Sequence, residues 1–338
     1  MLQFLKRKRL LLLFTMLAIM LSGCAQEASP LNPKGVQAKE QLDLMILSLV
    51  IMIVVVVVVF AIAIYVLIRF RARNGDHSIP KQVEGNHKLE IVWTVIPIVL
   101  LTILAVPTVG YTFQHDQNLS NNPDAVKVKV TAHQFWWEFD YPELGIFTAQ
   151  DLVIPVGKEI SFELTSADVN HSFWIPALGG KRDTNPGMST FMHLTPTEVG
   201  VFKGKCAELC GPSHALMDFK AIVLSQDDFD AWVAEMKAGS SVSADVAAGE
   251  EMFKANCIQC HAIQPDAKSP VAPHLNGFAN RERVAGVLPM DEESLKAWIR
   301  NPQAEKPGST MPKFGPGGQV ELSEDELDQL AKYLLELK

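Results

Sequence analysis

Two long apolar runs dominate the hydrophobic pattern of the chain. Residues 44–68 are almost entirely Ile, Val, Leu, Met and Ala, and residues 91–109 form a second run that contains Pro97 and Pro107. Each run is long enough to cross a bilayer, which takes about 20 residues, and a packed transmembrane helix tolerates proline. The pattern therefore predicts a two-helix transmembrane hairpin within residues 44–113.

Short runs with period-two alternation follow the hairpin. Residues 114–124 are polar and predict a linker, after which the alternation predicts several short strands separated by Pro and Gly turns. We expect these strands at residues 126–130, 135–141, 152–154, 160–164 and 219–224. This spacing is typical of a β-sandwich or barrel, here over residues 125–236, with a helix at 227–236 closing the domain.

The last third of the chain changes to a helical pattern. A Gly, Ser and Ala-rich linker at 237–244 precedes predicted helices at 245–256, 291–300 and 323–337. Ser323 and Glu326 form a capping-box start for the last helix. Residues 245–338 therefore predict an acidic, mainly helical module.

The N-terminus carries export signals. A basic start at residues 6–9 and an apolar run at 10–21 predict a signal peptide over residues 1–23. The run ends Leu-Ser-Gly-Cys24, which resembles a bacterial lipoprotein cleavage site, so Cys24 is a candidate for lipidation. The alternative is ordinary signal cleavage beside an incidental cysteine.

Charge sets the expected topology. Basic residues gather between the two apolar runs, which predicts that this loop is cytoplasmic. The outside N-terminal segment 24–43 and everything after residue 113 then face the extracytoplasmic side of a bacterial inner membrane. The net charge of −8 argues against nucleic acid as a partner. The loop residues are Arg69, Arg71, Arg73, Lys81 and Lys88.

One cluster of side chains has metal-ligand chemistry. Cys206, Cys210, His214 and Met217 fall within twelve residues, and His171 lies 35 residues before the first of them. Thiolate, imidazole and thioether together favour copper, and five candidates exceed the four that a structural zinc needs. This surplus points to more than one metal ion. Two alternatives stay open: a disulfide between the cysteines, or a zinc site that leaves the methionine unused.

A second motif is the haem-attachment signature Cys257-Ile-Gln-Cys260-His261. The two cysteines are expected to form thioethers with a haem, and His261 to bind the iron. An electron-transfer haem favours methionine as its sixth ligand. Met311 is the best candidate, with Met290 as the alternative.

At this point the chain resembles a known family. His-Ser-Phe-Trp at 171–174 and Cys-Ala-Glu-Leu-Cys-Gly-Pro-Ser-His-Ala-Leu-Met at 206–217 resemble subunit II of haem–copper cytochrome c oxidase. The C-terminal module resembles a class I cytochrome c. The resemblance implies a multidomain membrane protein: a transmembrane hairpin, a cupredoxin-like β-barrel and an all-α cytochrome c domain.

The resemblance also implies a ligand set for a binuclear copper centre, CuA. Cys206 and Cys210 would bridge two copper ions. The side chain of Glu208 would help to bind magnesium at the subunit I interface. The terminal ligands would be His171, His214, Met217 and the backbone carbonyl of Glu208.

Further roles follow from the same resemblance. In the haem module, Gly249 and Phe253 would pack against Tyr333, and the carbonyl of Pro273 would orient His261. Asp168 and Asp183 match positions near subunit I, although a solvated loop role fits them equally well.

Two other features have both a functional and an ordinary interpretation. Glu90 would be an entrance for protons, or simply an acid favoured by the helix dipole. Phe135, Trp136 and Trp137 would lie on the electron route, or form barrel core. Oxidases that accept soluble cytochrome c typically have Trp at the first of these positions, so Phe135 fits a chain that carries its own cytochrome.

The predicted function is therefore electron entry into a terminal oxidase. Electrons would pass from a donor outside the membrane, a cytochrome or a quinol–cytochrome c reductase complex, through haem c and CuA to subunit I. There oxygen would be reduced to water, coupled to proton translocation. The expected partners are subunit I, other oxidase subunits and membrane lipid. Alternatives are a CuA subunit of a nitric or nitrous oxide reductase, and a copper-delivery lipoprotein.

Overall fold

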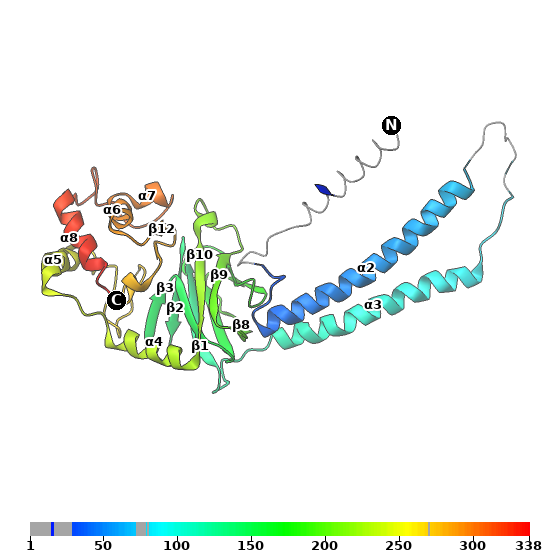
Figure 1. Ribbon diagram of the computed structural model, residues 1–338, viewed down its shortest axis with the longest axis horizontal. Coiled ribbons are helices and arrows are strands. Elements are labelled where there is room, and N and C mark those ends of the chain that lie inside the picture. The colour runs from blue at the N-terminus through cyan, green and yellow to red at the C-terminus, as the bar shows by residue number, and fades with distance from the viewer. Residues whose placement is uncertain (1–14, 17–28, 72–78, 80, 270) are drawn as a thin grey trace.

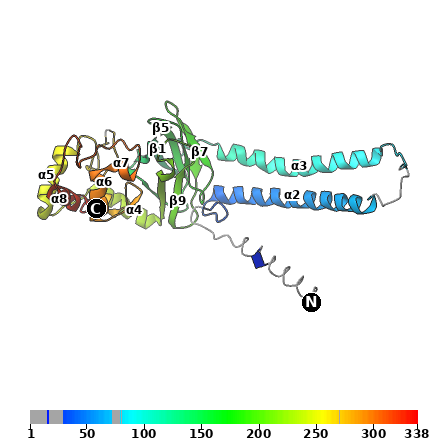
Figure 2. The same ribbon diagram turned by 90° about the horizontal axis from the view of Figure 1, so that it is seen from above.

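A computed structural model gives the fold of residues 15–16, 29–71, 79, 81–269 and 271–338. A two-helix hairpin, a β-sandwich and a helical module follow one another along the long axis of the molecule (Figures 1 and 2). Cys24 and all but residues 15–16 of the expected signal peptide lie outside the described residues. Export and lipidation therefore stay predictions.

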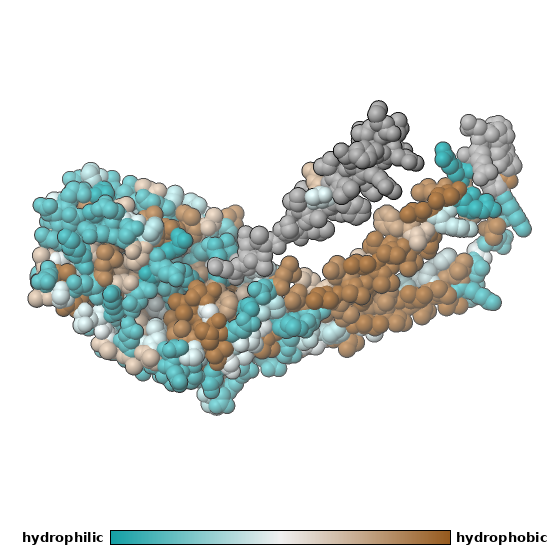
Figure 3. All heavy atoms as spheres, viewed as in Figure 1, coloured by the Kyte–Doolittle hydropathy of each residue, from teal (hydrophilic) through white to brown (hydrophobic). Residues whose placement is uncertain are grey.

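The hairpin consists of α2 (Val36–Arg69) and α3 (His87–His115). Apolar side chains are exposed along most of both helices, which form a continuous hydrophobic surface in Figure 3. By length and composition both helices can cross a membrane. As predicted, α3 continues through Pro97 and Pro107.

Helix α2 begins well before its apolar run, because its first turn is docked on the sandwich. The Val36 N–H donates to the carbonyl oxygen of Thr195 at 3.0 Å, and the Ala38 N–H donates to that of Leu178 at 3.2 Å. The Gln37 side chain accepts a hydrogen bond from the Thr195 N–H at 2.9 Å. These tertiary contacts extend the helix over residues whose hydrophobicity alone does not predict a span.

The sandwich consists of two five-stranded sheets with strand orders β3-β2-β1-β5-β8 and β4-β10-β9-β6-β7. The expected barrel thus takes the form of two facing sheets. The pairs β1–β5 and β4–β10 are parallel, and the other pairs are antiparallel. The strands are β1 (Val126–His133), β2 (Trp136–Tyr141), β3 (Ile146–Ala149), β4 (Asp151–Pro155), β5 (Ile160–Ser166), β6 (His171–Trp174), β7 (Lys181–Thr184), β8 (Thr190–Leu194), β9 (Gly200–Cys206) and β10 (Asp218–Leu224).

Aromatic side chains fill the space between the sheets. Trp137, Phe139, Phe162, Phe173 and Phe219 are all buried, and the last two stack with ring centroids 4.8 Å apart. Along β2 and β10, buried positions alternate with half-buried ones, so every second side chain points into the core. The core therefore forms directly beneath β6 and β9, the strands that carry His171 and Cys206.

Sequence patterning found five of these strands and missed the others. The strand β7 has the sequence Lys-Arg-Asp-Thr with one buried residue, and β9 interleaves its apolar positions with glycine and lysine. Such segments become strands because neighbouring strands satisfy their backbone hydrogen bonds, which local hydrophobicity does not record.

The helical module follows α4 (Gln226–Ala238), which packs on the sandwich. Its predicted helices are present, and Ser323 and Glu326 form the capping box expected from the sequence. The elements are η2 (Ala244–Val246), α5 (Ala247–Asn256), η3 (Phe278–Asn280), β11 (Arg283–Val284), β12 (Leu288–Pro289), α6 (Glu292–Arg300), α7 (Pro302–Glu305) and α8 (Glu324–Leu334).

Helices α5 and α8 cross at Gly249. A Cβ at this position would lie 2.1 Å from the Gln329 carbonyl oxygen and 2.7 Å from Tyr333 Cβ. Beside this crossing, Phe253 and Tyr333 pack with ring centroids 5.6 Å apart. The packing inferred from the resemblance to class I cytochrome c is therefore present.

Replacing Gly249 by alanine is expected to destabilise the helical module. The added methyl meets backbone, which cannot move aside as a side chain can, so we expect a loss of about 1–3 kcal/mol. Thermal unfolding of the holoprotein, followed by haem absorbance, measures it. Glu251→Ala on the exposed face of α5 is the control and should stay within about 0.5 kcal/mol of wild type. Equal stability of the two variants would contradict the close crossing.

Candidate metal centre and haem cavity

The two cysteines of the C-x3-C pair lie side by side at the end of β9. Their Sγ atoms are 3.9 Å apart and both thiols are free. A disulfide requires about 2.05 Å, so this arrangement holds two separate thiols. The backbone carbonyl oxygen of Glu208 lies 3.2 Å from Cys206 Sγ. The loop thus turns a carbonyl oxygen toward the sulfur pair.

Two imidazoles and a thioether complete the cluster. His171, the first residue of β6, places Nδ1 3.8 Å from Cys206 Sγ. His214 Nδ1 lies 3.6 Å and Met217 Sδ 3.7 Å from Cys210 Sγ. All six donor groups inferred from the sequence and the resemblance therefore converge. A zinc site would leave the buried thioether unused, whereas copper accepts every donor in this set.

The metal-free thiols differ in acidity. Burial raises the pKa of Cys206, but hydrogen bonds with His171, with His214 and with nearby backbone groups together outweigh burial, and the pKa is lowered. Burial and the neighbouring charge of Cys206 raise the pKa of Cys210 well above its ordinary value. Because a metal binds the thiolate, metal binding at this pair must displace a proton from Cys210.

Asp168 holds the other nitrogen of the His171 ring. His171 Nε2 donates to Asp168 Oδ1 at 2.8 Å, which directs Nδ1 toward the sulfur pair. The backbone N–H groups of Gln134 and Val169 also donate to this carboxylate, each at 2.6 Å. Burial raises the pKa of Asp168, but these hydrogen bonds outweigh it and the pKa falls.

From the sequence, Asp168 was expected either near the subunit I interface or in a solvated loop. In the structure it holds the His171 ring, and the spacing Asp-x-x-His was the available signal for that contact. Asp183, by contrast, lies exposed on β7, where its backbone carbonyl accepts a hydrogen bond from the Thr190 hydroxyl.

Replacing Asp168 by alanine is expected to weaken copper binding about 10–100-fold, because His171 loses the group that fixes its ring. Competition with a copper chelator measures the affinity. Asp183→Ala is the matched control and should bind copper as wild type does. Equal affinity of the Asp168 variant would show that the carboxylate does not orient the ligand.

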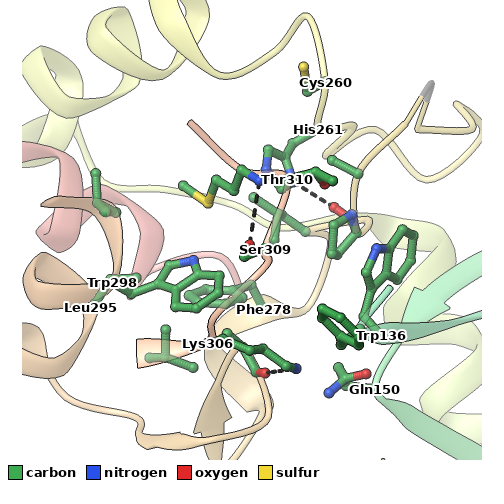
Figure 4. Close-up of a pocket in the computed structure, with 18 of the residues that line it drawn as sticks. Trp136, Gln150, Cys260, His261, Phe278, Leu295, Trp298, Lys306, Ser309 and Thr310 are labelled. Carbon is green, nitrogen blue, oxygen red and sulfur yellow. Dashed lines mark hydrogen bonds between the residues drawn. The ribbon is translucent and has the colours of Figure 1, made fainter. Parts of the chain in front are cut away.

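A partly open cavity lies against the haem-attachment motif. Cys260, His261 and Met311 line it together with aromatic side chains that include Phe278 and Trp298. Figure 4 shows His261 and the adjacent Ser309–Thr310 segment facing the same space. The cavity therefore brings the expected proximal histidine and the candidate methionine to one apolar site.

The histidine is oriented for iron binding. His261 Nδ1–H donates to the Pro273 carbonyl oxygen at 2.7 Å, which leaves Nε2 free. Burial lowers the pKa of His261 and favours the neutral ring that a metal requires. Met290 packs on the hydrophobic core of the module and does not line the cavity, which favours Met311 as sixth ligand. Cys257 is partly buried and, like Cys260, is a free thiol.

Two buried cations also line the cavity. Lys306 Nζ donates to the Ala285 carbonyl oxygen at 3.0 Å, and Arg281 Nη2 donates to that of His274 at 2.5 Å. Burial lowers the pKa of Lys306 to about 8 and that of Arg281 to about 10. Buried cations favour an anionic partner, and a haem supplies two carboxylates. Neither residue can be recognised from the sequence, since lysine and arginine in a loop carry no distinctive motif.

The aromatic run is divided between two environments. Phe135, just before β2, and Trp136 line the haem cavity. Trp137 points into the sandwich core, with its ring centroid 6.1 Å from that of His171. Alternation along the strand therefore directs neighbouring rings toward the cavity and toward the metal cluster.

Two acidic candidates lie at the surface. Glu90 is exposed in the first turn of α3, where His87 Nδ1 lies 3.7 Å from its carboxylate. Glu208 is also exposed, so its carboxylate is accessible to a neighbouring subunit while its carbonyl faces the thiols.

Comparison with known proteins agrees with this arrangement. The family models for the transmembrane and periplasmic domains of cytochrome c oxidase subunit II match residues 25–110 and 146–225, and the cytochrome c model matches residues 246–338. Cytochrome c oxidase subunit 2 of Bacillus sp. (strain PS3) is 52% identical over 352 residues, covering 98% of this chain and 97% of the relative. This chain belongs to the cytochrome c oxidase subunit II family.

Other similar proteins extend the comparison to parts of the chain. Quinol oxidase subunit 2 of Bacillus spizizenii is 36% identical over 230 residues, covering 67% of this chain and 72% of that protein. The crystal structure of the periplasmic domain of subunit II of cytochrome oxidase from Bradyrhizobium japonicum is 32% identical, with a TM-score of 0.32. It covers 33% of this chain and 94% of that one.

Family membership has direct consequences for this chain. It is a membrane subunit of an oxidoreductase complex, and residues 146–225 correspond to the periplasmic domain of the family. The sandwich is the cupredoxin-like domain, which implies copper, and the cytochrome c domain implies haem.

Proposed function

We propose that this subunit receives electrons from a donor outside the membrane on a covalently attached haem c and passes them to a binuclear CuA centre. The electrons then go to subunit I, where oxygen is reduced to water and protons are translocated. One observation carries the proposal: six copper-type donors converge in a sandwich that also contributes walls to the haem cavity.

At the copper centre, the protein provides a rigid and dry ligand set. When bound, the copper pair supplies a one-electron carrier whose charge is shared by two metals. Cys206 and Cys210 would bridge the metals, with His171, His214, Met217 and the Glu208 carbonyl as terminal ligands. Burial of both thiols, of Met217 and of His171 excludes water, and Asp168 fixes the His171 ring. These restraints would limit movement of the ligands when the copper pair gains or loses an electron.

At the haem, the protein provides attachment and orientation. When bound, the haem supplies a second one-electron carrier. Cys257 and Cys260 would attach it, while His261 and Met311 would be its axial ligands. The Pro273 carbonyl holds the His261 ring.

Several further roles belong to the assembled complex at the bacterial inner membrane. The large C-terminal region lies on the extracytoplasmic side, and Cys24 anchors the N-terminus through lipid. Glu208 shares a magnesium ion with subunit I, and Glu90 admits protons from the cytoplasmic edge. The exposed positions of both acids support these roles.

Ligand burial favours electron transfer over copper delivery. Cys206 and Cys210 are each 4% exposed, and His171 and Met217 are fully buried. A delivery protein needs exchangeable ligands, so such burial argues against that function. Native protein should therefore retain two copper ions and one covalent haem per chain on dialysis.

The proposed order of electron flow can be tested by anaerobic rapid mixing of the assembled complex with a reduced donor. The haem is expected to be reduced before CuA, because the haem module covers Phe135 at the copper face. Absorbance of the haem and of the copper centre, recorded separately, gives the order. Reduction of CuA before the haem would overturn it.

A further inference from the structure

The loop that carries the copper ligands touches the loop that precedes the haem methionine. Ser213, which immediately precedes His214, donates its hydroxyl to the Pro307 carbonyl oxygen at 2.6 Å. Ser213 is 1% exposed, so this hydrogen bond is shielded from water. Pro307 lies four residues before Met311 in the chain. The hydrogen bond therefore joins the residue beside the copper ligand His214 to the loop that leads to the proposed iron ligand Met311.

A single aromatic ring fills the space beside this hydrogen bond. A Cβ at Gly211 would lie 3.1 Å from Phe135 Cζ, and a Cβ at Gly308 would lie 3.1 Å from Phe135 Cε2. The ring thus lies against glycine backbone of both loops, at positions with φ of +131° and +82°. Phe135 is 3% exposed and also lines the haem cavity.

The residue before this ring makes a third connection. Gln134 lines the haem cavity, and its side-chain amide donates to the carbonyl oxygen of Cys210 at 2.5 Å. A residue in the wall of the haem cavity is therefore hydrogen-bonded directly to a copper-ligand residue.

We propose that Ser213, Phe135 and Gln134 form the electron-transfer contact between the haem cavity and the copper centre, which deepens and rests on the function proposed above. Electron tunnelling weakens steeply across empty space, and it is stronger through bonds, hydrogen bonds and packed rings. One electron leaves the reduced iron and enters the copper pair, so the iron is oxidised by one and the pair reduced by one. No bond forms or breaks.

The same contact makes the attached haem module the donor to copper. The ring at the copper face is covered by Gly308 of the haem module and is not available to a soluble cytochrome. External donors therefore deliver electrons to the haem rather than to the copper face.

The test uses two matched pairs of variants in the assembled oxidase. Ser213→Val and Ser213→Thr have nearly the same shape, but only threonine keeps the hydroxyl. Phe135→Leu is paired with Phe147→Leu, because Phe147 on β3 also contacts the haem module, where it stacks on His274 with ring centroids 6.2 Å apart. Photoreduction of the haem, followed by time-resolved absorbance of both centres, gives the rate of electron transfer from haem to copper.

In Ser213→Val and Phe135→Leu, we expect the rate of electron transfer from haem to copper to fall by about tenfold or more. Small losses of alignment between two reacting groups have effects of this size. Ser213→Thr and Phe147→Leu should keep the wild-type rate. The reduction potentials and the copper resonance spectrum should be unchanged in all four, since no ligand is altered. Wild-type rates in Ser213→Val and Phe135→Leu, with both centres loaded, would overturn the inference.

Failure of the underlying function gives a different result. If wild-type protein binds no copper or attaches no haem, the proposed function itself fails. If the wild type transfers electrons and all four variants do so equally, only the proposed contact fails. A uniform slowing in Phe147→Leu as well as Phe135→Leu would assign the effect to general docking and also contradict the proposal.

Discussion

Replacing Cys210 by serine is expected to abolish the copper centre while the covalent haem remains. Cys210 Sγ lies within 3.9 Å of the Cys206, His214 and Met217 donor atoms, so its loss affects three of the other donors at once. A serine hydroxyl is a poor ligand for copper, and a binuclear site without one of its bridges does not form. Metal analysis and electron paramagnetic resonance should show loss of the copper pair.

Met217→Leu is the informative companion to this variant. The thioether is a weak ligand, so leucine should keep both copper ions and change the reduction potential. Haem content should equal wild type in both variants, because the two sites are held by different domains. A Cys210→Ser protein with a full binuclear copper signal would disprove the bridging role.

The second large effect is expected at the haem. Met311→Leu should leave the haem attached through Cys257 and Cys260 but convert the iron from six to five ligands. Loss of methionine ligation lowers the reduction potential of the haem, so the external donor should reduce the haem less readily and net delivery of electrons to copper should slow. Visible absorption of the oxidised and reduced protein reports the ligation state, and redox titration gives the potential.

Met290→Leu separates the two candidate methionines. Met290 packs against the core of the helical module and does not line the cavity. Its conservative replacement should therefore keep the six-ligand spectrum and the potential. The reverse outcome, with Met290→Leu losing the sixth ligand, would transfer the role to that residue.

Local patterns predicted the elements that carry strong local signals. The span of α3, the strands β1 and β5, and the capping box of α8 follow from apolar length, alternation and a side-chain motif. The start of α2 and the strand β9 did not follow, because docking and sheet pairing decide them. His171 begins β6, a strand that the alternation did not predict and that pairs with both β7 and β9.

The sequence by itself determined which donor groups the two sites contain. Thiolates, imidazoles and a thioether at close spacing indicate copper wherever they meet, and the Cys-x-x-Cys-His motif indicates haem, because ligand chemistry belongs to residue type. It also determined the membrane hairpin, since the length of an apolar run sets what can span a bilayer.

Only the tertiary structure decided which distant residues serve those sites. The buried cations Arg281 and Lys306 in the cavity wall, and the hydrogen bond from Ser213 to Pro307, depend on residues that no local pattern connects. Ordinary polar residues acquire such roles through burial and a precise partner, and both arise when separate strands and loops pack together.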